Sequence, residues 1–100
     1  MKVEITQTEN KVMASIAGRL DTVTSSEFEK NLAPYFAMND IELHLDCAEM
    51  EYISSAGLRV VLTTHKNITS KGDNFILSNL NKEVGSVFDM TGFSRILTIK

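Results

Sequence analysis

The chain has 100 residues, 43% of them hydrophobic, which is enough to bury one apolar core but too little for a second one. Ten Lys and Arg residues against thirteen Asp and Glu residues give a net charge of −3, and no basic run offers a surface for a phosphate backbone. The composition therefore predicts one domain over residues 1–100 and argues against a nucleic-acid partner.

Cysteine usage and hydropathy indicate where the protein works. Cys47 is the only cysteine, so no intramolecular disulfide can form, and the N-terminal residues lack the apolar region of a signal peptide. No apolar stretch approaches the roughly 20 residues that span a bilayer. We therefore expect a cytoplasmic protein without a membrane segment.

The first elements along the chain are predicted to be a hairpin and a helix. Residues 2–8 and 12–20 alternate between polar and apolar positions around a polar stretch, which is typical of two antiparallel strands. The sequence Thr-Ser-Ser-Glu at positions 24–27 matches a capping box, so a helix should begin there. Pro34 lacks an N–H group and should kink or end this helix, which we expect to stop near Ala37.

The rest of the chain alternates strands with helices. Period-two alternation predicts a strand at 41–47, and helical spacing from Leu58 predicts a helix at 56–71 followed by Gly72. A strand at 74–78, a helix between Asn81 and Gly92, and a last strand at 95–99 complete the series. The order β-β-α-β-α-β-α-β predicts an α/β fold with a mixed sheet of about five strands.

Two adjacent serines stand at the predicted turn between the third strand and the second helix. A helix N-terminus presents unpaired N–H groups and positive potential, which would favour a phosphate on Ser55. The alternative is that Ser54 or Ser55 only caps the helix. Spacing alone does not separate these two interpretations.

The residue types that catalysis requires do not gather in the sequence. His44 alternates within a strand and His65 lies on the apolar face of a helix, so both are interpreted as structural. Cys47 has no companion cysteine and is interpreted as a buried apolar residue. The glycines form no nucleotide-binding fingerprint. We therefore expect no enzyme activity, no metal and no cofactor.

Residues 52–59, Tyr-Ile-Ser-Ser-Ala-Gly-Leu-Arg, resemble the signature of the STAS domain found in bacterial anti-sigma factor antagonists. The resemblance extends through Gly-Arg-Leu-Asp at 18–21, Leu-Asp at 45–46 and Phe-Asp-Met-Thr-Gly-Phe at 88–93. It implies a STAS-like fold and a protein that binds its partners without catalysis.

The resemblance also implies a mechanism. The unmodified protein would bind an anti-sigma factor serine kinase and release a sigma factor, phosphorylation of Ser55 would end binding, and a PP2C-type phosphatase would restore it. The implied partner-binding residues surround the acceptor: Asp21, Ser54, Ser55, Ala56, Gly57 and Arg59. Asp21 would lie near the acceptor or simply form a turn before the first helix, and Arg59 would meet a phosphate or point to solvent.

The sequence departs from the family pattern in two places. Ser54 stands where many family members have an aspartate, which lowers the charge beside Ser55. Most of the helix that usually follows the last strand is lacking, which should leave one face of the sheet less covered. The alternative function is a non-switching STAS interaction module, either a scaffold subunit or a regulatory domain associated with a transporter.

Overall fold

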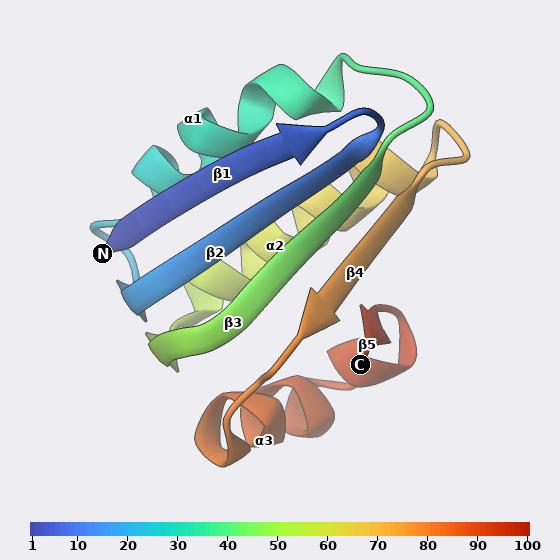
Figure 1. Ribbon diagram of the computed structural model, residues 1–100. Helices are drawn as coiled ribbons and strands as arrows, with labels where there is room; N and C mark the ends of the chain where they lie inside the picture. Colours follow the sequence, from blue (N-terminus) through green and yellow to red (C-terminus); the bar gives the residue numbers. More distant parts are fainter.

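The computed structural model describes residues 1–100 and contains a mixed five-stranded sheet with three α-helices (Figure 1). The elements follow one another as β1 (Lys2–Thr8), β2 (Lys11–Leu20), α1 (Ser25–Phe36), β3 (Glu42–Ile53), α2 (Ser55–Thr69), β4 (Asn74–Ser78), α3 (Lys82–Thr91), the 3₁₀ helix η1 (Phe93–Arg95) and β5 (Thr98–Ile99). The predicted order of strands and helices is confirmed.

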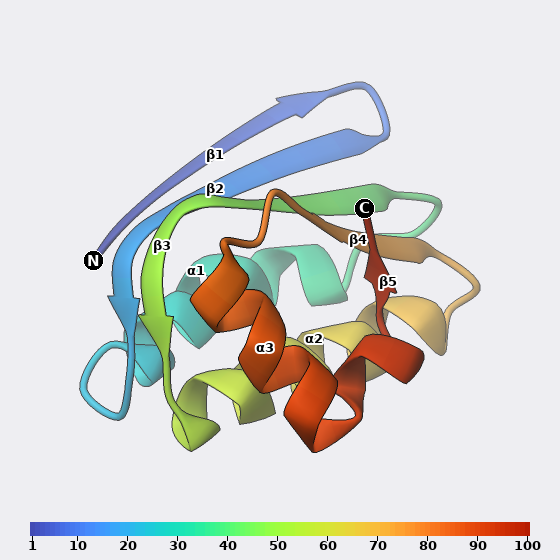
Figure 2. The ribbon, with the colours of Figure 1, turned by 90° about the horizontal axis from the view of Figure 1, so that it is seen from below.

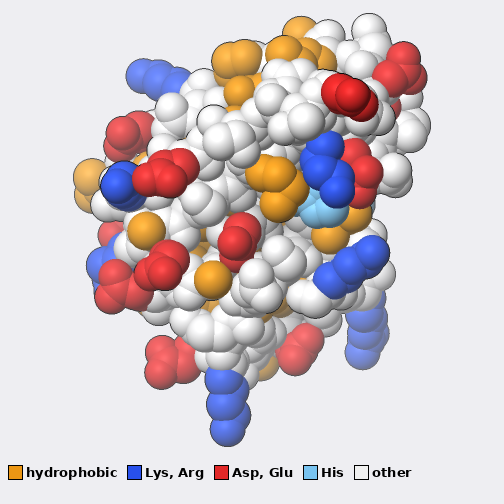
Figure 3. All heavy atoms as spheres, in the orientation of Figure 1, with side chains coloured by type: hydrophobic (Ala, Val, Ile, Leu, Met, Phe, Trp, Pro, Cys, Tyr) orange, Lys and Arg blue, Asp and Glu red, His pale blue; other side chains and the backbone are white.

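The strands lie in the sheet in chain order, β1-β2-β3-β4-β5. β1 and β2 form the predicted antiparallel hairpin, and the other neighbouring pairs are parallel. The helices lie on one side of the sheet (Figure 2). The opposite side carries acidic and basic side chains interspersed with small hydrophobic patches (Figure 3). No helix combines the length and the apolar character needed to cross a membrane.

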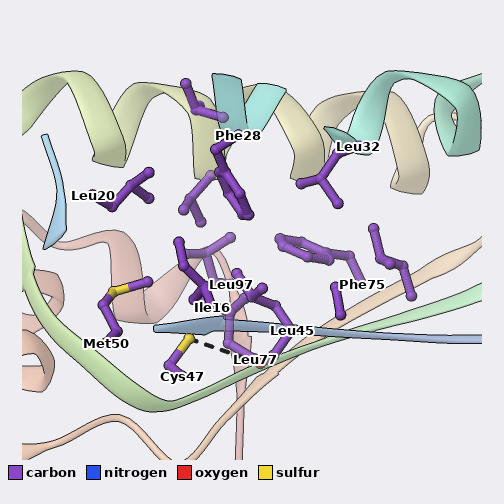
Figure 4. Packing of buried hydrophobic residues seen from close by; sticks show 14 of the residues in the cluster. Ile16, Leu20, Phe28, Leu32, Leu45, Cys47, Met50, Phe75, Leu77 and Leu97 are labelled. Atoms are coloured by element: carbon purple, nitrogen blue, oxygen red, sulfur yellow. Dashed lines mark hydrogen bonds between the residues drawn. The ribbon is translucent and has the colours of Figure 1, made fainter. Parts of the chain in front are cut away.

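The core fills the space between the sheet and the helices (Figure 4). Burying each large apolar side chain contributes about 1.5–3 kcal/mol relative to leaving it in water. The most deeply buried large side chains come from strands and helices alike: Val12, Ile16, Leu20, Phe28, Leu32, Leu43, Leu45, Met50, Ile68, Phe75, Leu77 and Phe88. The sheet and the helices therefore share one hydrophobic core.

The third strand is longer than the sequence predicts, because it continues past Cys47 to Ile53. Twice along its pairing with β2, the register shifts by one extra residue of β3, so that Ser15 pairs with Asp46 but Ala17 with Glu49. Each such bulge moves the buried positions out of strict alternation and bends the strand. Cys47, Met50 and Ile53 are consequently buried at a spacing of three, and the predicted loop after position 47 is wrong.

The predicted capping box at the start of α1 is also wrong, although the helix does begin at Ser25. Thr24 makes no side-chain cap hydrogen bond to the helix. Instead the Asp21 carboxylate accepts hydrogen bonds from the N–H groups of Val23 at 3.0 Å and Thr24 at 3.2 Å. Pro34 lies inside the helix, which ends at Phe36, close to the predicted end.

The last strand is shorter than predicted. Residues 93–95 form the 3₁₀ helix η1, and β5 contains only Thr98 and Ile99. Gly92, with φ +80°, ends α3 in the left-handed conformation, and the chain turns directly into η1. Of the apolar residues that predict a strand at 95–99, Ile99 alone pairs with β4, whereas Leu97 is buried outside the strand and Ile96 is exposed.

Lys71 joins the end of α1 to the turn between α2 and β4. Its Nζ donates to the carbonyl oxygens of Tyr35 and Met38, where α1 has no basic residue in its last turn. The same Nζ lies 3.6 Å from Oδ2 of Asp73, a buried oxygen without a hydrogen bond. Lys71 therefore compensates both a helix C-terminus and a buried carboxylate.

Replacing Lys71 with methionine should lower the free energy of unfolding by about 1–3 kcal/mol, because the Asp73 carboxylate would stay buried without its cation. Urea denaturation of the wild type and the variant measures this change. Lys30→Met is the matched control, because Lys30 is exposed on α1 and forms no ion pair. Equal stability of the two variants would contradict this role for Lys71.

Candidate partner-binding site

The end of β3 delivers Ser54 and Ser55 to the edge of the sheet, where α2 begins. The strands β2 and β3 curl together toward the helices at this end (Figure 2). Leu20 pairs with Ile53, and the Leu20 carbonyl accepts a hydrogen bond from the Ser54 N–H at 2.9 Å. Asp21, the next residue of the chain, is thereby held at the same edge as the two serines.

The two serines have different roles in the fold. Ser54 is the N-cap of α2, and its Oγ accepts a hydrogen bond from the Gly57 N–H at 3.3 Å. Ser55 is the first helical residue, is exposed, and its hydroxyl makes no hydrogen bond. The sequence leaves open which of the two serines caps α2, and in the structure it is Ser54.

Gly57 lies in the first turn of α2, pressed against the end of β2. A Cβ atom at this position would stand 2.7 Å from the Leu20 carbonyl oxygen and 2.9 Å from both Ile53 Cγ1 and Leu20 Cγ. Distances this short are steric overlaps with backbone and core atoms. Gly57 is itself buried, so it sets the distance between helix and sheet, while Ala56 beside it is half-buried.

Gly57→Ala should lower the free energy of unfolding by about 1–3 kcal/mol, because the added methyl group overpacks the contact with Leu20. Gly85→Ala is the matched control. Gly85 is also helical, and a Cβ there meets nothing closer than Leu80 Cβ at 3.9 Å. That variant should gain about 0.5–1 kcal/mol from helix propensity alone. Chemical denaturation measures both, and stabilisation by Gly57→Ala would contradict the close contact.

Asp21 is committed to the turn before α1. Hydrogen bonds from the backbone of Thr24 and Val23, with the nearby Arg19 guanidinium, hold the pKa of Asp21 below its usual value. Arg19 Nε lies 3.6 Å from Oδ2 of Asp21, and the Arg19 guanidinium stacks over the Tyr52 ring at 4.1 Å. Asp21 therefore forms the turn, and it also presents an ionised carboxylate at the edge that carries Ser55.

Arg59 follows Ser55 by one helical turn. It is exposed and forms no ion pair within the chain. Residues four apart on a helix are neighbours, so the guanidinium can reach a group attached to Ser55. Both residues line one hollow of about 330 Å³.

That hollow contains residues that sequence reasoning misses. Thr91 at the end of α3 and Phe93 in η1 face Leu58 and Leu62 of α2 across it. Both belong to the stretch at 88–93 that carries the resemblance, but they lie more than twenty positions from α2 in the chain, so their place beside Ser55 is seen only in the structure. A second hollow, of about 230 Å³, lies between the end of β3 and α3 and includes Glu51, Tyr52 and Glu83.

The two histidines and the cysteine do not gather into a common site. His44 Nε2 lies 2.7 Å from Glu42 Oε1 on the sheet, and His65 lies on α2 with its Nδ1 buried and unpaired. Burial raises the pKa of the Cys47 thiol to about 12, so it is protonated and inert. No group of three or more His, Cys, Asp and Glu side chains is placed to hold a metal ion.

The sequence and the fold are those of a known family. The STAS domain model matches residues 2–100, and the chain belongs to the STAS domain family. It is 29% identical over 99 residues to the anti-sigma-B factor antagonist of Bacillus subtilis (strain 168), a match that covers 99% of this chain and 90% of the relative. The homologues are thus regulators that antagonise anti-sigma factors.

Solved structures confirm the fold. An anti-sigma factor antagonist from Mycobacterium paratuberculosis superposes with a TM-score of 0.88 at 17% identity, covering 98% of this chain and 83% of that one. The phosphorylated form of the Bacillus cell fate determinant SpoIIAA gives a TM-score of 0.77 at 15% identity, covering 99% and 91%. The murine anion transporter Slc26a9 gives 0.73 at 14% identity, covering 85% of this chain but 14% of the transporter.

Proposed function

We propose that this protein is an anti-sigma factor antagonist controlled by phosphorylation of Ser55. In its unmodified form it binds an anti-sigma factor serine kinase and so releases a sigma factor. The kinase ends the interaction by phosphorylating Ser55, and a PP2C-type phosphatase reverses the modification. The names of its homologues support the antagonist role.

The division of roles between Ser54 and Ser55 carries the proposal. Ser54 supplies the cap of α2, whereas the hydroxyl of Ser55 forms no hydrogen bond within the fold and the residue is exposed. A kinase can therefore reach the hydroxyl and esterify it without breaking a hydrogen bond of the fold. A free serine hydroxyl on an exposed helix start is what a reversible modification requires.

A phosphate on Ser55 is compatible with the fold, but it changes the charge of the surface around it. It adds about −1.5 to −2 charges at neutral pH. The first N–H groups of α2 and its positive end stabilise an anion there, and Arg59 is within one turn. The added charge and its hydration should then block a partner that docks on this edge, while the core is unaffected.

The surface that docks the kinase surrounds Ser55 in this proposal. Asp21, Ser55 and Arg59 offer exposed or half-buried polar groups to the partner. Ser54 and Gly57 contribute by holding the first turn of α2 in place, and the half-buried Ala56 lies in that turn beside Ser55.

A second candidate function is a non-switching STAS module. The likeness to a segment of the anion transporter Slc26a9 favours it, because the same fold serves there within a much larger chain. In that case the same edge would bind a partner permanently, and Ser55 would stay unmodified.

Incubation with the cognate kinase and ATP should add one phosphate to the wild type and to Ser54→Ala, but none to Ser55→Ala. Intact-mass spectrometry counts the phosphates. Thermal or urea unfolding gives the matched structural readout: Ser54→Ala should lose about 1 kcal/mol of stability as a lost cap, whereas Ser55→Ala should change by less than about 0.5 kcal/mol.

Two results would contradict the proposal. A wild type that binds the kinase but gains no mass would favour the non-switching module. A phosphate that persists in Ser55→Ala and disappears in Ser54→Ala would show that Ser54, and not Ser55, is the acceptor.

A further inference from the structure

One face of α2 is left open along its whole length. The hollow that contains Ser55 meets a second hollow of about 590 Å³ at Leu62, which lines both. The second hollow continues along α2 past Lys66 to Ser70, with Ile96 on its far side. From Ser55 to Thr69 the groove is about 21 Å long, judged from the rise of an α-helix.

The floor of this groove, called the α2 groove below, is apolar. Leu58, Leu62, Phe93 and Ile96 line it, and Ile96 is 52% exposed although it is a large aliphatic residue. Leu58 is already buried in the core, so the apolar surface that remains open comes from the half-buried Leu62 and Phe93 and from Ile96. Covering this remaining apolar surface with a partner is favourable, because it removes the surface from water.

The rim of the α2 groove is positive, in a chain whose net charge is −3. Arg59 and Lys66 line it together with His65, and no Asp or Glu residue does. Neither Arg59 nor Lys66 forms an ion pair within the chain. The hollow on the other side of α3 differs, because Glu51 and Glu83 line it. The two uncompensated cations therefore favour an acidic ligand in this groove.

We propose that the α2 groove is the docking site for an acidic amphipathic helix of the partner kinase. This inference rests on the proposed function and extends the contact with the kinase from Ser55 to the far end of α2. A helix satisfies its own backbone hydrogen bonds, so it can lie along an apolar floor and present side chains at spacings of three and four. Its apolar side chains would cover Leu62 and Ile96, with carboxylates facing Arg59 and Lys66.

Another copy of this chain fits the groove poorly. Its exposed helical surfaces, on α1 and α3, place Lys30 and Lys82 among their carboxylates. These faces carry charges of both signs, whereas the cationic rim of the α2 groove favours a ligand with negative charges only. The kinase is the better occupant because it already has to reach Ser55, which lies at one end of the same groove.

The groove also explains how one phosphate could release the partner. A phosphoryl group on Ser55 would lie one turn from Arg59 and compete for that guanidinium with the carboxylates of the docked helix. It would also repel those carboxylates directly. Modification at one end would thereby weaken contacts along the whole α2 groove.

The test measures the affinity of the cognate kinase, identified through the phosphorylation of wild-type Ser55, for two groove variants by calorimetry at low and high salt. Lys66→Glu reverses the rim charge and Ile96→Asp places a charge on the floor, both far from Ser55. Lys30→Glu on α1 and Met90→Asp on α3 are matched controls, because both residues are exposed and outside the groove. Circular dichroism establishes that each variant is folded.

Both groove variants should raise Kd about tenfold or more, while the controls stay within about twofold. The affinity of Lys66→Glu should also depend less on salt than that of the wild type. The maximal rate of Ser55 phosphorylation should persist in both, with a raised KM.

Wild-type affinity in both groove variants, with the kinase still bound and Ser55 still phosphorylated, would overturn this inference and leave the proposed function intact. A homodimer that Ile96→Asp dissociates, with unchanged kinase affinity, would also overturn it by assigning the groove to self-association. If no kinase phosphorylates wild-type Ser55, the proposed function is overturned, and this inference, which rests on it, is overturned with it.

Discussion

The close approach of the first turn of α2 to the end of β2 governs the geometry of this protein. The Leu20 carbonyl accepts a hydrogen bond from Ser54 and leaves no space for a side chain at Gly57. This contact fixes where the helix begins, which serine caps it and which serine faces solvent. The two bulges in β3 serve the same end, because they bend the strand so that Ile53 reaches Leu20.

A rigid scaffold with one free hydroxyl suits a reversible signal. Ser54 accepts a hydrogen bond from a backbone N–H group at the start of α2, and Asp21 accepts two in the turn before α1. None of these hydrogen bonds involves the side chain of Ser55. A change of charge at Ser55 can therefore alter what the surface binds while the core packing stays the same. The α2 groove adds length to that surface, and Arg59 belongs to both parts of it.

Local patterns in the sequence predicted the element order and the mixed sheet, since turn residues and apolar periodicity act over a few positions. The register shifts of β3 were hidden, because burial of Cys47, Met50 and Ile53 at a spacing of three resembles neither a strand nor a helix. The cap of α1 was misassigned because Asp21 and Thr24 both have suitable side chains. Thr91, Phe93 and Ile96 could not be assigned to a site from the sequence, because they meet α2 only through tertiary packing.

The most direct test of this account compares amide NMR spectra of the protein before and after phosphorylation of Ser55. The account predicts shift changes confined to the first turn of α2 and the α2 groove, with the amides of core residues such as Phe28 and Leu45 unmoved and the unfolding temperature preserved. Shift changes spread through the core, or a marked loss of stability, would show that Ser55 supports the fold and would contradict the division of roles between the two serines.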